Sequence, residues 1–149
     1  MNFLTLYYFF LTDKISTRTL HEKVFSIGNF LELIILNRML IAVAGPYTAG
    51  TEEQKKKNLD AMNEAASRVY KKGHIPVIGV NTAFFVLEKL TGENKNKAMM
   101  DIALAIVDRC DALLLIGNSP GANKERDVIL SKGKQVFYSI DEIPEGNLV

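Results

Sequence analysis

The sequence has no tryptophan, one cysteine, two histidines and four prolines among its 149 residues. The single cysteine, Cys110, excludes an intramolecular disulfide framework and a cysteine-rich zinc site. Two histidines leave little for a histidine-based metal centre, and the sequence contains no motif for an organic cofactor. We therefore expect no metal and no cofactor, and a reducing, cytoplasmic location.

The chain also lacks an excess of charge of either sign and a long apolar run. It has 18 basic and 17 acidic residues, and no basic run is longer than residues 55–57. This balance argues against a protein that binds nucleic acid through bulk charge. The apolar stretch at residues 3–11 is nine residues long, whereas a membrane-spanning helix needs about 20. We expect neither a nucleic-acid partner nor a membrane partner.

The aromatic residues are distributed unevenly along the chain. Residues 1–38 hold seven of the thirteen aromatic side chains and carry no recognisable motif. The composition changes at Met39, where an apolar segment typical of a first buried strand begins. The sequence thus predicts an extension over residues 1–38 and a folded domain over residues 39–149. Two interpretations of the extension stay open: an arm or helix that packs on a partner subunit, or a segment outside the natural protein, which then starts at Met39.

Apolar runs and amphipathic segments alternate from Met39 onward. Four short apolar runs predict strands at residues 40–44, 75–80, 112–116 and 135–139. Helical spacing predicts helices between Thr51 and Gly73 and at residues 82–90, 97–110 and 122–131. Strands that alternate with helices favour a parallel sheet with crossover connections. The sequence therefore predicts an α/β fold: a small three-layer Rossmann-like domain with a mostly parallel sheet of four to five strands.

Ligands of open parallel sheets bind beyond the carboxyl ends of the strands, where three predicted loops meet. These loops cover residues 45–51, the region near residues 79–82, and residues 117–123. The first loop bears glycines and hydroxyl groups and leads into a helix, which favours a phosphate or a carboxylate. It matches neither the P-loop nor the dinucleotide-binding pattern, and an ordinary strand-to-helix turn is the alternative interpretation.

Glu125 lies about one turn into the helix that follows the third loop. We expect the helix dipole and nearby N–H groups to hold this carboxylate ionised, as a nucleophile requires. The alternative is a glutamate that only stabilises its own helix. Cleavage at an acetal carbon uses two carboxyl groups, and Asp101 is the candidate for the second. Asp108, near the far end of its helix, and Asp111, at the opposite edge of the sheet, are weaker candidates.

Six segments carry a resemblance, in chain order. They are residues 40–47 (Leu-Ile-Ala-Val-Ala-Gly-Pro-Tyr), 73–77 (Gly-His-Ile-Pro-Val), 110–115 (Cys-Asp-Ala-Leu-Leu-Leu), 119–125 (Ser-Pro-Gly-Ala-Asn-Lys-Glu), 133–137 (Gly-Lys-Gln-Val-Phe) and 142–144 (Glu-Ile-Pro). Together they resemble the nucleoside 2-deoxyribosyltransferase-like superfamily, in an uncharacterised branch that is also similar to deoxynucleoside 5′-monophosphate N-glycosidases. The resemblance covers residues 39–144.

The resemblance implies chemistry on the N-glycosidic bond of (deoxy)nucleosides or their 5′-monophosphates. Glu125 would be the nucleophile that attacks the sugar C1′ and expels the base, with Asp101 assisting. A second nucleoside as acceptor makes the reaction a base exchange, and water makes it a hydrolysis. The resemblance also implies at least a homodimer. The residues expected to bind the nucleoside or nucleotide are Gly45, Tyr47, Thr48, Gly50, Thr51, Asn81, Ser119 and Gly121.

The sequence departs from the family pattern at one position. The family usually has an aspartate eight residues before the aspartate that precedes the third strand, and that position is Ala103 here. Asp101 lies two residues earlier, which corresponds to about 200° of rotation on a helix. Three interpretations therefore stay open: an enzyme that cleaves or transfers the N-glycosidic bond, a non-catalytic nucleotide-binding module of the same fold, and a protein with a different activity or a purely structural role.

Overall fold

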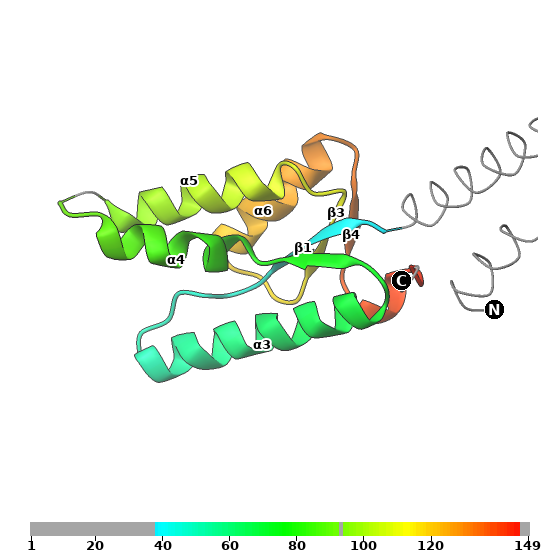
Figure 1. Cartoon of the computed structure of the whole chain (residues 1–149), viewed down its shortest axis with the longest axis horizontal. Coiled ribbons are helices and arrows are strands. Elements are labelled where there is room, and N and C mark those ends of the chain that lie inside the picture. Colours follow the sequence, from blue (N-terminus) through cyan, green and yellow to red (C-terminus); the bar gives the residue numbers. More distant parts are fainter. Residues whose placement is uncertain (1–37, 93, 147–149) are drawn as a thin grey trace, which may run out of the picture. The chain divides into compact units, whose positions relative to one another are not determined.

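The structure is a computed structural model that describes residues 38–92 and 94–146. Residues 1–37 of the predicted extension lie outside the described residues, and the boundary near Met39 stays a prediction. The described chain alternates strands and helices in the predicted order (Figure 1). The elements are β1 (Leu40–Ala44), α3 (Glu52–Lys71), β2 (Ile75–Val77), α4 (Gly79–Lys89), α5 (Lys95–Val107), β3 (Ala112–Leu115), α6 (Pro120–Ser131), β4 (Gln135–Phe137) and a final 3-10 turn, η1 (Ile140–Glu142).

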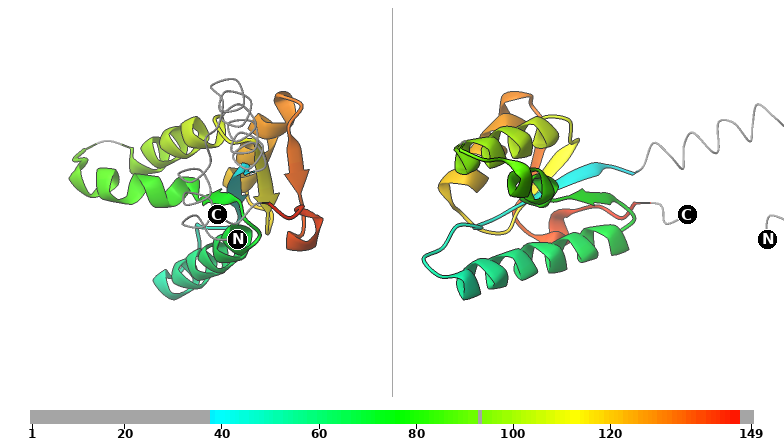
Figure 2. Two further views of the ribbon diagram at one scale, coloured as in Figure 1. Left: turned by 45° about the vertical axis from the view of Figure 1, so that its right-hand side comes forward. Right: turned by 60° about the vertical axis from the view of Figure 1, so that its left-hand side comes forward.

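The four strands form one sheet in the order β2-β1-β3-β4, and all neighbouring pairs are parallel. The helix α3 lies on one face of this sheet, while α5 and α6 cover the other and α4 packs along α5 (Figure 1). Figure 2 shows the same separation of α3 from the α4–α5 pair in two further views. The α/β prediction is confirmed, with four strands. The chain adds β2 on one side of β1 and then returns to β3 on the other, so the topology reverses between β1 and β3.

Two helices begin at hydroxyl caps that follow a strand and its loop. The Thr51 Oγ1 accepts a hydrogen bond from the Gln54 N–H at 3.2 Å, and α3 continues from there. The Ser119 Oγ accepts from the Ala122 N–H at 3.1 Å at the start of α6. Such caps satisfy N–H groups that the first helical turn leaves without partners. The chain leaves α3 through Gly73, whose φ of 88° suits glycine.

The second predicted strand is wrong in its extent. The strand β2 covers only Ile75–Val77, and Gly79 already begins α4. Residues 78–80 are buried or half-buried in the structure, so they carry the same apolar signal in a strand and in the buried start of a helix. Periodicity does not separate these two cases over so short a run. The early start of α4 brings Gly79 close to α5 and α6.

Alternate residues of the central strands supply two separate cores. Ile41 and Val43 of β1 pack with Leu114 and with the buried face of α3. Their neighbours Ala42 and Ala44 point to the other face, where they pack with residues of α5, β3, α6 and β4. Both faces of a parallel sheet are covered by helices, which explains why these strands read as continuous apolar runs.

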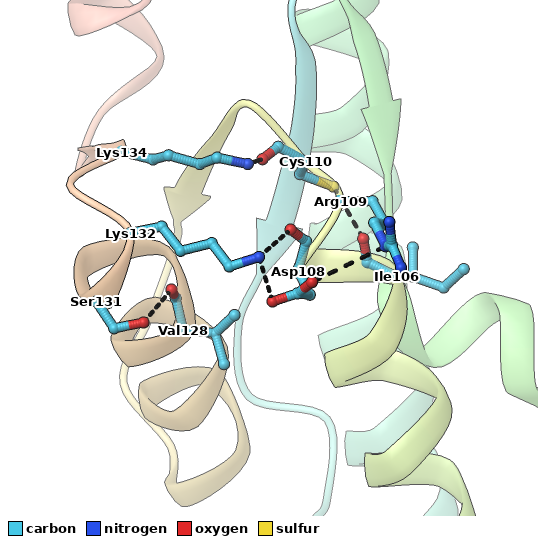
Figure 3. Close-up of polar contacts among 8 residues, drawn as sticks. All are labelled: Ile106, Asp108, Arg109, Cys110, Val128, Ser131, Lys132 and Lys134. Carbon is cyan, nitrogen blue, oxygen red and sulfur yellow. Dashed lines mark hydrogen bonds and ion pairs between the residues drawn. The ribbon is translucent and has the colours of Figure 1, made fainter.

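Polar groups at the amino ends of the strands are paired with one another. The Asp111 Oδ2 accepts from the Leu40 N–H at 2.7 Å, which fixes the start of β1 beside β3. Lys132 contacts Asp108 at the end of α5 in two ways: Nζ lies 2.6 Å from Oδ1 and donates to the backbone carbonyl at 3.1 Å. Lys134 Nζ donates to the Cys110 carbonyl, so two ammonium groups cap the carboxyl end of α5 (Figure 3).

His74 ties the closing segment to the start of β1. Its side chain is 1% exposed, Nδ1 accepts from the Met39 N–H at 3.1 Å, and Nε2 lies 2.8 Å from the Pro144 carbonyl oxygen. With Nδ1 accepting, Nε2 carries the proton and donates. The Lys72 Nζ adds a hydrogen bond to the Ile143 carbonyl at 2.8 Å. These contacts hold the chain after η1 against the amino edge of the sheet.

Candidate functional site

A cavity of about 260 Å³ opens beyond the carboxyl ends of β1 and β3. This is the place where the strand order reverses, and ligands of open α/β sheets bind at such a reversal. Its volume lies just under the range of about 300–1,000 Å³ common for small-molecule pockets. The residues that line it are Gly45, Tyr47, Thr48, Val80, Asn96, Met99, Met100, Ala103, Ser119, Pro120, Gly121, Ala122, Lys124 and Glu125.

Six of the residues predicted for the site line this cavity together. Gly45, Tyr47 and Thr48 come from the loop after β1, and the Tyr47 ring packs against Phe84 of α4 with centroids 5.7 Å apart. The remaining three lie at or in α6: Ser119, Gly121 and Glu125. The structure thus brings the first and third predicted loops together around one cavity.

Glu125 is the acidic residue among those that line the cavity. It is 7% exposed. An atom in the Cβ position at Gly79 would lie 2.9 Å from the Glu125 Oε1 and 2.9 Å from the Ala103 Cβ. The glycine at the start of α4 therefore leaves the space that the carboxyl group occupies. Three elements, α4, α5 and α6, meet at this point.

Burial raises the pKa of the Glu125 carboxyl from 4.5 to about 7. The expectation that its surroundings hold this carboxylate ionised is therefore wrong. Desolvation by the packed α4 and α5 disfavours the charged form, and no group of the described residues donates a hydrogen bond to the carboxyl oxygens. Protonated and ionised Glu125 coexist near pH 7, so the group has access to both acid and base chemistry.

Asp101 does not share the cavity with Glu125, and the prediction that it provides the second carboxyl group there is wrong. Its side chain is 60% exposed and pairs with Lys97 one turn earlier on α5. Met99, Ala103 and Val107 form the buried face of this helix, and Asp101 lies on the opposite side because two residues correspond to about 200° of rotation. Ala103 lines the cavity in its place.

Gly50, Thr51 and Asn81 are not among the residues that line the cavity. Thr51 uses its hydroxyl to cap α3, and an added Cβ at Gly50 would meet nothing within 4 Å. The Asn81 Nδ2 donates to the Asn63 Oδ1 at 3.0 Å, so this side chain connects α4 to α3. The Asn81 Oδ1 is buried with no hydrogen-bond partner among the described residues.

Sequence reasoning missed Asn96, Met99, Met100 and Lys124 as lining residues. Met100 lies in the helix predicted at residues 97–110, but the helical spacing of its apolar residues does not separate a core position from a cavity wall. Lys124 precedes Glu125 and is exposed. Its place one turn after Gly121 was a usable signal, because residues three apart lie on the same side of a helix.

The described residues hold no cluster of three or more histidine, cysteine, aspartate or glutamate side chains arranged for a metal. Cys110 is fully buried, and burial raises the pKa of its thiol to about 11, so it is not a reactive nucleophile. Among the helices that the structure describes, none has the length and apolar character to span a membrane.

Two comparisons with known proteins bear on identity. No curated protein matches the chain in sequence. Residues 39–138 match a family described as a domain of unknown function, DUF4406. This match spans the sheet, all four described helices and every residue that lines the cavity. The chain therefore belongs to the DUF4406 family.

Proposed function

We propose that the protein cleaves or transfers the N-glycosidic bond of (deoxy)nucleosides or their 5′-monophosphates, with Glu125 as the nucleophile. The observation that carries this proposal is a buried glutamate in a cavity where the strand order reverses. The resemblance of the surrounding segments to the nucleoside 2-deoxyribosyltransferase-like superfamily supports it. Glu125 also occupies the position that this resemblance assigns to the nucleophile.

In the proposed reaction the ionised Glu125 carboxylate attacks the sugar C1′, and the base departs as the C1′–N bond breaks. Water, or the nitrogen of a second base, then attacks C1′, and the bond from C1′ to the Glu125 oxygen breaks. The proton that the attacking group gives up passes to the departed base. Only ionised Glu125 performs the first step. Because burial raises its pKa to about 7, the rate of this step increases with pH through the neutral range.

The other lining residues suit a nucleoside or nucleotide. Tyr47 and the two methionines offer apolar contact to a base, and the Ser119 hydroxyl is placed for a sugar or phosphate oxygen. If the substrate carries a 5′-phosphate, Lys124 is the ammonium group that lines the cavity. Residues 39–149 contain 14 basic and 14 acidic residues, so a local contact and not a general positive field must hold such an anion.

The proposed setting is cytoplasmic, and the proposed assembly is a homodimer. On α4, Phe85 is 78% exposed and Val86 is 47% exposed, which offers an apolar contact surface for a second copy. Phe84 and Leu87 of the same helix are half-buried and belong to the subunit itself. A particle mass near 16.6 kDa in gel filtration would contradict the dimer.

A non-catalytic nucleotide-binding module is the second candidate. The observation that favours it is the single carboxyl group among the lining residues, since cleavage of glycosides commonly uses two. Such a module would hold its ligand intact. A ligand that binds only the folded state raises the apparent stability by mass action.

The test is chromatography of reaction mixtures that contain pooled nucleosides and 5′-monophosphates. We expect the wild type to release free base, and the Glu125→Gln variant to lose at least about 1,000-fold in rate, since it removes the reacting group. The matched control is Glu88→Gln, a change of an exposed glutamate on α4, which should leave the rate unchanged. Thermal stabilisation by a ligand that stays intact, with no base released, would support the binding module and contradict the enzyme.

A further inference from the structure

The cavity contains one acidic side chain where glycoside chemistry commonly uses two. Among the lining residues in the described part of the chain, Glu125 is the only aspartate, glutamate or histidine. Ala103 of α5, which is 1% exposed, lines the cavity with its methyl group. A Cβ at Gly79 would lie 2.9 Å from both the Ala103 Cβ and the Glu125 Oε1, so position 103 borders the space around the carboxyl group. An alanine there supplies no proton.

A single carboxyl group cannot take both roles in the first step. As the nucleophile it must be ionised, and as the acid that protonates the departing base it must carry a proton. The other polar groups that line the cavity are hydroxyl, amide and ammonium groups of Tyr47, Thr48, Ser119, Asn96 and Lys124. Phenols, alcohols and ammonium groups are much weaker acids than a carboxylic acid. The site is therefore poor in a proton donor and suited to a substrate that needs none.

We propose that the preferred substrates are N-glycosides whose base carries a positive charge and departs as a neutral molecule, such as N7-alkylated purine or pyridinium nucleosides. This inference rests on the proposed function and narrows its substrate class. A neutral base leaves as an anion unless an acid protonates it. A cationic base already carries the charge that this protonation would supply.

The reaction balances without an acid from the protein. A Glu125 carboxylate oxygen forms a bond to C1′, the C1′–N bond breaks, and its electron pair neutralises the cationic base, which leaves. Water then attacks C1′, the bond from C1′ to the Glu125 oxygen breaks, and the carboxylate is regenerated. One proton of this water passes to solvent. The sum is a cationic nucleoside and water giving a neutral base, a free sugar and a proton.

The buried Glu125 and the Tyr47 ring fit a cationic base, while the Lys124 ammonium group that also lines the cavity is exposed and screened by solvent. Glu125 is 7% exposed, and an opposite charge brought beside a buried carboxylate interacts strongly because little water screens it. Such a charge also favours the ionised form of Glu125, which is the form that reacts. Tyr47 lines the cavity, and an aromatic face attracts a cation within about 6 Å of its centroid.

The test compares N7-methylguanosine with guanosine, which differ by one methyl group and one positive charge. Both are supplied with ribose and with 2′-deoxyribose, and as nucleosides and 5′-monophosphates. Base release is measured by chromatography, with Glu125→Gln as the baseline for spontaneous hydrolysis. We expect the wild type to show a kcat/KM for the cationic substrate at least about 100-fold higher, since general acid help is typically worth 10²–10⁴-fold.

The C1′–N bond of a cationic nucleoside also breaks more easily without any enzyme. The pH profile of the wild type separates this effect from a site that needs no acid. For the wild type we expect kcat/KM with a pyridinium nucleoside, whose positive charge does not titrate, to rise as Glu125 ionises and then to stay level up to pH 9. A reaction that needs an acid gives a bell-shaped profile instead. A falling alkaline limb with this substrate would overturn the inference.

The Ala103→Asp variant is the complementary change, because it places a second carboxyl group beside Glu125. We expect it to raise guanosine cleavage and to reduce the selectivity at least tenfold. If the buried aspartate prevents folding, the selectivity and the pH profile of the wild type still test the inference. A wild-type kcat/KM for guanosine within tenfold of the value for N7-methylguanosine would overturn this inference and leave the proposed function standing. Release of base from the pooled nucleosides and 5′-monophosphates but from neither of these compounds would overturn this inference alone, and no release from the pool or from either compound would overturn both.

Discussion

Polar groups at the amino edge of the sheet have hydrogen-bond or ion-pair partners, whereas the buried carboxyl group at the carboxyl edge has none among the described residues. At the amino edge, Asp111 accepts from Leu40, His74 bridges Met39 and Pro144, and Asp108 pairs with Lys132. The hydrogen bond from Lys132 lowers the pKa of Asp108. At the carboxyl edge, Glu125 is buried without a donor among the described residues, and its pKa rises to about 7.

This difference separates groups that hold the fold from a group that is ready to react. A buried polar group with partners stabilises the folded state, while one without partners is costly. Active sites concentrate such costs, because a perturbed carboxyl group has access to chemistry that a paired one lacks. Changes at the amino edge should therefore lower stability and spare activity, whereas changes at the carboxyl edge should lower activity.

The largest expected effect on stability is at His74. His74→Ala removes two hydrogen bonds and leaves a cavity, so we expect the free energy of unfolding to fall by about 4 kcal/mol. Activity per folded molecule should stay unchanged, because the histidine lies at the edge opposite to the cavity. Urea unfolding followed by circular dichroism, with base release measured on the folded fraction, checks both. A loss of activity without a loss of stability would break the comparison.

The pH dependence of stability tests Glu125 next. Its carboxyl holds a proton more tightly in the folded state than in the unfolded state, where the usual value is 4.5. This contribution to stability is fully present below about pH 4.5 and is lost as pH rises through about 7. Relative to Glu125→Gln, the wild type should lose up to about 3 kcal/mol between pH 4 and pH 8.

Urea unfolding of both proteins at several pH values measures this difference directly. Glu88→Gln serves again as the control, because its exposed carboxyl group should leave the pH dependence of the wild type unaltered. If the free energies of unfolding of the wild type and of Glu125→Gln change with pH in parallel, the carboxyl group is solvated and the contrast between the two edges is removed.

The smallest of the three effects on stability is expected at Gly79. In Gly79→Ala the new methyl group lies 2.9 Å from Glu125 Oε1 and Ala103 Cβ, and such overpacking costs about 2 kcal/mol. Because the carboxyl group must shift, we expect base release to fall at least tenfold. Gly50→Ala is the matched control, with nothing within 4 Å of the added atom. Equal activity of the two variants would show that Glu125 tolerates displacement.

Much of the fold was predictable from local pattern. Three features depend only on neighbours within a few residues. They are the strand segment at residues 40–44, the caps and glycines at the ends of the helices, and the alternation of strands and helices. The site was predictable in part: six predicted residues do meet in one cavity, namely Gly45, Tyr47, Thr48, Ser119, Gly121 and Glu125. The prediction for Asp101 was wrong because the side of α5 that faces the cavity depends on how this helix is rotated against its neighbours. A shift of two residues along the helix moves a side chain from the cavity side to the solvent side.

The sequence by itself determined the layer order and the parallel sheet, because strand and helix periodicities are local properties of the chain. It also determined that Glu125 follows the third strand at the start of a helix. Only the tertiary structure decided that this carboxyl group is buried, that its pKa rises and that Ala103 borders it. These facts arise where Gly79, Ala103 and Glu125 meet from three different helices, and desolvation depends on that meeting and not on any segment alone.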